Sequence, residues 1–415
     1  MNTKKPSIEL VLAWRNVWKN KRRTVLTLLT IMVGTAMIIF MRALQDGGYA
    51  QMIDDAVSAN TGHIQIHEKG FYENQSIDYA FIPGAALLER LKTGPGISGF
   101  TRRIHASGLI SSASTTEGAM IQGVDPAAEK NVSNIHRSLR KGGRYLSAGD
   151  GDSVVIGDIM ARNLGVKEGD EVSIISQGFD GTFAAANLTV VGIFRSGNVE
   201  YDRFLVLMPI AKAVATFSVD NYVNSIVLRL ADGRMTERIR DELRASFGTK
   251  SLEIMGYDEL IPDLMQYIMI DRISGEILYW ILFLVVAFGV LNTIQMSVYE
   301  RIREFGIMLA VGTEPGQVRW MVQIESAIIS VYGILMGIAL GVALSAYFAV
   351  YPMDFSGYAQ EFAEWGMATT ILPAKLEAWN PLTTAIVTFI LSSAFTMFPA
   401  RRASRLRPVE AIRKL

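Results

Sequence analysis

The sequence predicts an α-helical membrane protein with four transmembrane helices and one large α+β domain outside the membrane, made of two subdomains. Two observations carry this prediction. Half of the residues are hydrophobic and only 19% are charged, and the apolar residues gather in four long runs. Soluble domains average about 25% charged residues, so the totals fit membrane spans combined with a water-soluble part. The chain contains no cysteine, which excludes disulfides and thiolate metal sites.

Four apolar runs are long enough to cross a hydrocarbon core of ~30 Å, which needs ~20 apolar residues in a helix. We assign transmembrane helices to residues 24–44, 275–298, 324–350 and 381–400. The first run follows "KNKRR" and has some features of a cleaved signal peptide. It is longer than the apolar core of a signal, and no small-x-small cleavage site follows it, so we interpret it as an uncleaved anchor.

The orientation of the spans follows from the lysine and arginine content of their flanks. The flanks 1–23, 299–323 and 401–415 are rich in these cations, whereas the loop 351–380 contains Lys375 as its single lysine or arginine, among several acidic residues. This bias predicts a multi-pass protein with both termini and the 299–323 segment in the cytoplasm. Residues 45–274 then form a domain outside.

The segment before the first span has an amphipathic pattern. Val11, Trp14, Val17 and Trp18 fall on one helical face, with cations nearby. Tryptophan and flanking cations are typical of a helix lying in the membrane interface. A helix packed beneath the spans explains the pattern equally well.

The third span has small residues every four positions: Gly333, Gly337, Gly341 and Ser345. Such a ridge allows another helix to approach closely, so its predicted role is helix packing. The partner helix belongs either to this chain or to a second copy.

The external domain alternates strand and helix patterns. Residues 61–70 show the two-residue period of a strand, and residues 223–248 combine a strand with an amphipathic helix. Between them, residues 143–216 are rich in strand patterns and turns. We interpret 143–216 as a β-rich subdomain inserted into the first one.

The sequence offers no catalytic, cofactor or metal site. His63 and His67 lie about 13 Å apart if both are in one strand, too far to share a metal alone, and His105 and His136 are the other histidines. There is no phosphate-binding G-x-x-x-x-G-K-[ST] loop, no H-E-x-x-H and no G-x-S-x-G. No charge lies in the middle of a span, which argues against a proton-coupled carrier. We therefore expect no enzyme activity and no nucleic-acid partner, and any energy source to be another polypeptide.

The cytoplasmic segment "ERIREFGIMLAVGTEPGQV" (300–318) predicts a short amphipathic helix. Its apolar face comprises Ile302, Phe305, Met308 and Leu309. Arg301 and Glu304 are spaced to pair at i, i+3. Gly312 suits the helix end, Thr313 the cap of the next helix, and Pro315 its first turn. Without a nucleotide site in the chain, a rigid handle for another protein is the preferred interpretation over a membrane-surface helix with no partner.

This segment resembles the permease subunits of the MacB/LolC/LolE/FtsX class of ABC transporters, and the likeness covers essentially the whole chain. The pattern E-R-x-R-E-[IF]-G-[IL]-x-x-A-x-G is matched from Glu300 to Gly312, and a second pattern from Pro399 to Arg413. The resemblance implies a coupling helix that docks in a partner ABC ATPase, which binds the ATP. The implied ATPase-coupling residues are Glu300, Arg301, Arg303, Glu304, Phe305, Gly306 and Gly312. It also implies a dimer with a second permease subunit, identical or different, in the bacterial inner membrane, with a periplasmic domain.

Within this class the chain is most similar to the lipoprotein-releasing LolC/LolE branch, over residues 120–126, 154–172, 188–202 and 371–379. The stretch 176–187 lacks the prolines of the projecting hairpin by which LolC captures a periplasmic chaperone, which leaves that capture open. The implied cargo is a lipoprotein or another amphiphile, released toward the outer membrane. From topology we place its acyl chains near Met41, Leu44, Ile268, Ile273 and Ile277.

Three alternatives remain at this stage. A MacB-like tripartite efflux permease would grip a periplasmic adaptor and expel drugs or peptides. An FtsX-like regulator would transmit force to a cell-wall hydrolase. A receptor without an ATPase is the third.

Overall fold

The computed structural model describes residues 8–248, 251–358 and 370–407. These form two compact units. The helical unit contains the described residues up to 50, 267–355 and those from 371 on, and the external unit contains 51–266 and the described part of 356–370. The chain changes unit at residues 50–51, 266–267, 355–356 and 370–371.

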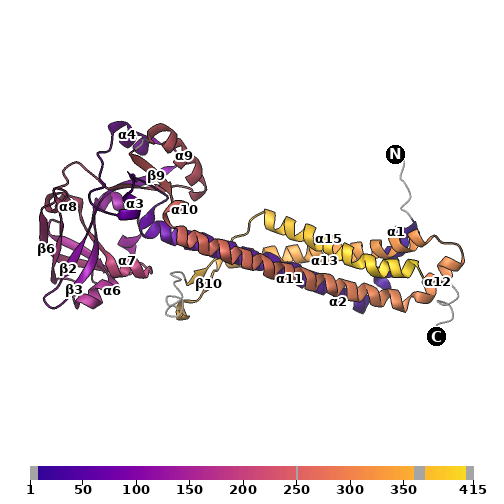
Figure 1. Ribbon diagram of the computed structural model, residues 1–415. Coiled ribbons are helices and arrows are strands. Elements are labelled where there is room, and N and C mark those ends of the chain that lie inside the picture. Colours follow the sequence, from indigo (N-terminus) through magenta and orange to yellow (C-terminus); the bar gives the residue numbers. More distant parts are fainter. Residues whose placement is uncertain (1–7, 249–250, 359–369, 408–415) are drawn as a thin grey trace. The chain divides into compact units, whose positions relative to one another are not determined.

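The helical unit is built on four long helices that are apolar enough to cross a membrane. Figure 1 shows them with the short helix α12 between α11 and α13. The helices are α1 (Ile8–Lys19), α2 (Lys21–Ala56), α11 (Pro262–Glu300), α12 (Ile302–Ala310), α13 (Pro315–Val350) and α15 (Trp379–Ser404). The predicted number of spans is confirmed. The helices α2 and α11 extend well beyond the assigned bounds 24–44 and 275–298.

Close contacts between α13 and its neighbours hold this unit together. The helix α15 turns a row of small polar side chains inward; the buried ones are Thr384, Thr388, Ser392 and Thr396. A strand pair, β10 (Met353–Asp354) and β11 (Ile371–Leu372), follows α13. The backbone N–H of Lys375 donates to the carbonyl of Ala43, 2.8 Å away, and thereby fixes this loop to α2.

The N-terminal helix α1 packs on α13. Ala13 and Val17 are buried, while Trp14 and Trp18 are nearly half exposed. The Trp14 ring lies 6.0 Å from the ring of Tyr332 on α13. The packing alternative is therefore what the structure shows. Exposed tryptophans beside an apolar span suit the membrane interface, and that role stays a prediction. The side chain of Val11 lies outside the described residues.

The external unit contains a nine-stranded sheet of order β3-β7-β4-β6-β5-β2-β8-β1-β9, in which β3 also pairs with β2. This extra pairing closes β2, β3, β7, β4, β6 and β5 into a ring. The strands are β1 (Ile64–Glu68), β2 (Ile97–Ser111), β3 (Thr116–Val124), β4 (Ser153–Gly157), β5 (Glu171–Gln177), β6 (Phe183–Phe194), β7 (Leu205–Pro209), β8 (Ser225–Leu230) and β9 (Leu252–Gly256).

The described part of this unit has two large hydrophobic cores and a smaller one around Phe194 and Leu205. The ring encloses the first, to which Ile104, Ile121 and Ile174 contribute together with Phe217. The second lies between the antiparallel layer β2-β8-β1-β9 and the helices α4 (Ala85–Thr93) and α9 (Thr236–Phe247). The strand β2 belongs to both, because residues 97–103 pair with β8 and residues 108–111 pair with β5.

The bounds of the inserted β-rich part differ from the 143–216 expected. The ring also contains β2 and β3, so it begins near residue 103. Its closure depends on the parallel pairings β3–β7 and β4–β6, which join strands far apart in sequence. Periodicity within one segment cannot reveal such pairings.

Short helices connect the strands of the external unit. They are η1 (Val57–Thr61), α3 (Phe71–Asn74), α5 (Pro126–Glu129), η2 (Ile135–Arg137), α6 (Asp158–Leu164), α7 (Val199–Phe204), α8 (Ile210–Phe217), η3 (Gly233–Met235) and α10 (Tyr257–Leu260). The π-helical turn η1 continues α2 into this unit. Arg103 donates to the backbone carbonyl of Asn60 in η1, at 2.6 Å, and pairs with Glu129 at 2.6 Å. Both charged side chains are 1% exposed.

Candidate functional site

The candidate site is the short helix α12 with the helix ends around it. The helix α11 ends at Glu300, and α12 begins after Arg301, whose φ of −108° breaks the helical path. Gly312 ends the segment with a φ of +101°, a conformation that glycine adopts without strain. These local conformations make α12 a separate short helix rather than an extension of either span.

The next helix begins one residue later than expected. Pro315 occupies its first turn, as predicted, but its N-cap is Glu314 rather than Thr313. The backbone N–H of Glu314 donates to the side-chain oxygen of Gln317 at 3.1 Å, while the N–H of Thr313 donates back to the carbonyl of Met308 at 3.0 Å. Thr313 is therefore still part of the turn that closes α12.

The two faces of α12 differ in exposure. Phe305 is 1% exposed and packs in the apolar core of the helical unit, and Gly306 is buried beside it. On the other face Arg303 is exposed, Ile307 is 47% exposed and Val311, at the helix end, is 83% exposed. Phe305 therefore stabilises the position of α12 and is not available to a partner in this conformation, although the family resemblance implied an ATPase contact there.

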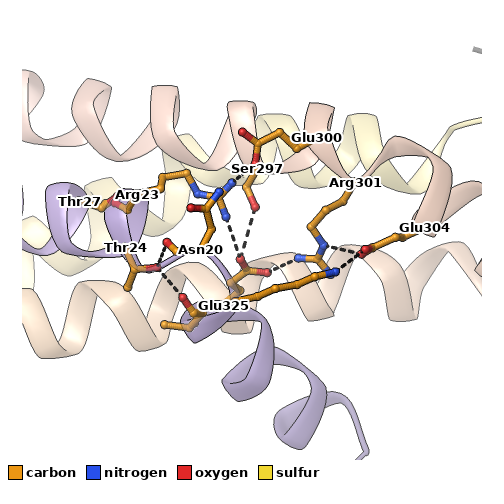
Figure 2. A network of polar contacts seen from close by, with 11 residues as sticks. Asn20, Arg23, Thr24, Thr27, Ser297, Glu300, Arg301, Glu304 and Glu325 are labelled. Atoms are coloured by element: carbon orange, nitrogen blue, oxygen red, sulfur yellow. Dashed lines mark hydrogen bonds and ion pairs between the residues drawn. The ribbon is translucent and has the colours of Figure 1, made fainter. Parts of the chain in front are cut away.

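Arg301 faces inward and contacts three groups at once. Its Nη1 lies 2.9 Å from Glu325 Oε2, and its Nε lies 2.9 Å from Glu304 Oε2, which is the predicted i, i+3 pair. The guanidinium also lies 4.9 Å from the ring centre of Phe305. Figure 2 shows Arg301 between the two carboxylates.

Two further ion pairs join α12 and the end of α11 to the N-terminal helices. Lys19 Nζ lies 2.6 Å from Glu304 Oε1, and Arg23 Nη1 lies 2.7 Å from Glu300 Oε2. The hydrogen bond from Lys19, followed by that from Arg301, holds the pKa of Glu304 below its usual range. At neutral pH the Glu304 carboxylate is therefore charged, as both cations require.

Glu325 was not expected in this site. It is buried in α13, accepts a 3.4 Å hydrogen bond from the hydroxyl of Ser297 and lies 4.0 Å from Arg23 Nη2. One sequence signal points to it: Glu325 is the single acidic residue within α13. A carboxylate beside an apolar span needs a partner, but which cation supplies it depends on tertiary packing.

The glycine ridge of α13 faces α2. A Cβ added at Gly333 would lie 2.7 Å from the Cβ of Ile31, and one added at Gly337 would lie 2.7 Å from the Cβ of Thr35. A Cβ at Gly341 would come 3.0 Å from the backbone oxygen of Ala36. The described partner of the ridge therefore belongs to this chain.

The residues predicted to meet cargo have different exposures. Ile273 and Ile277 are more than half exposed on α11, and Met41 and Leu44 are partly buried on α2. Ile268 is 6% exposed, so it is not accessible in this conformation.

Polar contacts join α2 and α11 between these residues. Both carboxylate oxygens of Glu276 lie 2.8 Å from Arg42 Nη2, and the Tyr279 hydroxyl donates to Gln45 Oε1 at 2.8 Å. These pairs fix one helix against the other at that level.

His63, His67 and His105 occupy structural positions. His105 Nε2 lies 2.9 Å from the Ser225 hydroxyl, and burial lowers the pKa of His105 to about 3. Burial also lowers the pKa of His63 to about 4 and that of His67 below its usual value. Within residues 8–248, 251–358 and 370–407, no group of three or more histidine, aspartate or glutamate side chains is arranged to hold a metal ion.

The fold and the α12 site define a multi-span membrane protein with one large α/β domain after its first span. Residues 24–246 match the MacB-like periplasmic core domain, and residues 276–408 match the FtsX-like permease C-terminal domain. The chain belongs to the MacB/LolC/FtsX family of ABC-transporter permeases. The predicted family and fold class are confirmed.

Two relatives illustrate the range of the family. The chain is 24% identical over 429 residues to "Macrolide export ATP-binding/permease protein MacB" of Neisseria meningitidis serogroup A, covering 98% of this chain and 60% of that protein. It is 22% identical over 396 residues to "Lipoprotein-releasing system transmembrane protein LolC" of N. meningitidis serogroup B, covering 91% of each. The chain thus spans about 60% of the length of the MacB relative.

Among solved structures, the chain is similar to the periplasmic region of MacB from Actinobacillus actinomycetemcomitans. The identity is 15% and the TM-score 0.36, over 52% of this chain and 98% of that one.

Proposed function

We propose that this chain is the inner-membrane permease subunit of an ABC transporter, that a partner ATPase subunit drives it, and that it releases or moves lipoproteins. In this proposal both termini lie in the cytoplasm, residues 45–274 lie in the periplasm and two permease subunits form the transmembrane dimer. ATP-driven displacement of α12 moves α2 and α11, and through them the external unit.

The observation that carries this proposal is the exposed apolar surface of α12. Ile307 and Val311 expose much of their side chains, next to the cation Arg303. Apolar side chains with a neighbouring arginine are typical of the centre of a protein interface. The family implies an ABC ATPase partner, and in this proposal that partner covers the surface.

The lipoprotein cargo has separate support. The LolC relative, named for lipoprotein release, matches over 91% of its own length. Ile273 and Ile277 expose branched apolar side chains on α11, which suits contact with acyl chains. Burial of each CH₂ group contributes about 0.8 kcal/mol, so an apolar surface that covers several of these groups adds measurably to the binding of a lipid anchor.

Substitution of Val311 by glutamate tests the docking surface. The matched control is Val350→Glu, at a valine that is 70% exposed in α13. We expect Val311→Glu to lower the amount of ATPase that co-purifies with the chain by about tenfold. The control variant should retain it. Equal recovery of the ATPase with both variants would contradict docking on α12.

A tripartite efflux permease is the second candidate, because the MacB relative aligns with 98% of this chain. The two candidates differ in cargo. Purified complex in proteoliposomes should release a membrane-anchored lipoprotein on addition of ATP if the first is right. Transport of a macrolide or peptide, without lipoprotein release, would favour the second.

A further inference from the structure

Glu325 is a buried carboxylate between three other elements of the helical unit. Its side chain is 4% exposed, and it meets Arg301 before α12, Ser297 near the end of α11 and Arg23 near the start of α2. Figure 2 shows these groups converging on Glu325 from separate helices. A charge removed from water in this way is retained only with close opposite charges and hydrogen bonds.

The inward-facing residues of α12 and its N-terminal turn are thus already paired or packed within the chain. The Arg301 side chain is 12% exposed, and both carboxylates that it meets belong to this chain. Phe305 is buried beneath it. These residues cannot be the main contacts of a docked ATPase, even though they match the E-R-x-R-E pattern of the family. The opposite face, with Arg303, Ile307 and Val311, is the accessible one.

The contacts of α12 and its flanks reach Lys19, at the end of α1, and Arg23, near the start of α2, which continues into η1. Lys19 pairs with Glu304, and both side chains are about half exposed or more. Arg23 pairs with Glu300, whose side chain is 42% exposed. Exposed ion pairs hold weakly because water and salt screen them. Among the ion pairs that hold α12, that of Arg301 with Glu325 is therefore the one most shielded from water.

We propose that α12 separates docking from transmission: its outward face binds the ATPase, and Glu325, as a positioning residue, holds its inward face so that α2 and α13 move with it. This inference rests on the proposed function as an ATPase-driven permease. In this role Glu325 acts without touching ATP, the ATPase or the cargo. Loss of the Glu325 charge should leave binding of the ATPase intact. It should weaken the coupling of α12 movement to movement of α2 and α13.

The test uses the complete complex with its native ATPase, purified through the permease chain and reconstituted in lipid nanodiscs. The variants are Glu325→Gln, which removes the charge at nearly constant size, and Glu325→Asp, which keeps it. The control is Ser330→Ala, at a side chain that is also buried in α13. For each we would measure the amount of bound ATPase, the stimulation of ATP hydrolysis by the permease, and hydrogen exchange across residues 300–312.

We expect Glu325→Gln to bind the ATPase normally, to lose about fivefold or more of the stimulation, and to exchange faster in α12. Glu325→Asp should recover part of the stimulation, and Ser330→Ala should behave like the native chain. Stimulation by Glu325→Gln equal to the native value would overturn the inference, as would loss of ATPase binding in that variant. If the native chain itself neither binds nor stimulates an ATPase, the proposed function fails first.

Discussion

The packing of α13 on α2 gives the sharpest prediction about stability, because the space beside Gly337 is too small for the methyl group of an alanine. The added Cβ would lie 2.7 Å from the Cβ of Thr35 and 2.8 Å from the backbone oxygen of Met32. Ordinary contact begins at 3.4 Å, so the helices must separate by about 0.7 Å. Overpacking of this kind costs about 1–3 kcal/mol, and the better helix propensity of alanine offsets up to about 1 kcal/mol. We expect a net loss of roughly 1–2 kcal/mol.

Gly316 provides the matched control in the same helix, since a Cβ added there meets nothing within 4 Å. Gly316→Ala should leave stability unchanged or raise it slightly. In thermal unfolding followed by tryptophan fluorescence in nanodiscs, Gly337→Ala should lower Tm by roughly 2–8 °C. A Gly337→Ala variant as stable as Gly316→Ala would refute the close approach of α2 to the ridge.

Three further predictions concern charges. Glu129→Gln should destabilise the chain by about 3–5 kcal/mol, because it leaves Arg103 buried without a counter-charge, and chemical unfolding would measure the loss; no loss would mean that the pair is open to water. Burial lowers the pKa of folded His63 to about 4, so on acidification the unfolded state takes up this proton before the folded state does. The free energy of unfolding should therefore fall by ~2 kcal/mol between pH 7 and pH 5 and level off below pH 4. The fall should be smaller in His63→Gln, and a fall of equal size in that variant would exclude His63 as the cause. Lys19→Met should change stability by less than about 1 kcal/mol, since the pair with Glu304 is exposed; a larger loss would contradict the weak role given to that pair.

Features within one segment were the ones that the sequence made predictable. Hydropathy and length located four spans, and the four-residue spacing of Gly333, Gly337 and Gly341 located the packing face of α13. The i, i+3 spacing predicted the Arg301–Glu304 pair, and Gly312 marked the end of α12. Each of these depends on neighbours within one or two helical turns.

Features that depend on tertiary contacts were missed or misjudged. The amphipathic pattern of α12 identifies an apolar side, but it cannot tell whether a partner or the chain itself covers Phe305. Glu325 becomes part of the site because α13 brings it to Arg301, 24 positions earlier in the chain. The ring of the external unit similarly depends on the pairing of β3 with β7. Only the three-dimensional structure supplies these contacts.

The central claim is that an ATPase docked on α12 drives this chain to release a lipid-anchored cargo. Purification of the intact chain from native membranes, followed by addition of ATP and identification of what leaves the complex, tests it most directly. We expect an ABC ATPase in the purified complex and ATP-dependent release of a lipoprotein, both lowered about tenfold by Val311→Glu. A complex that contains no ATPase, or that releases the same cargo with and without ATP, would contradict the account.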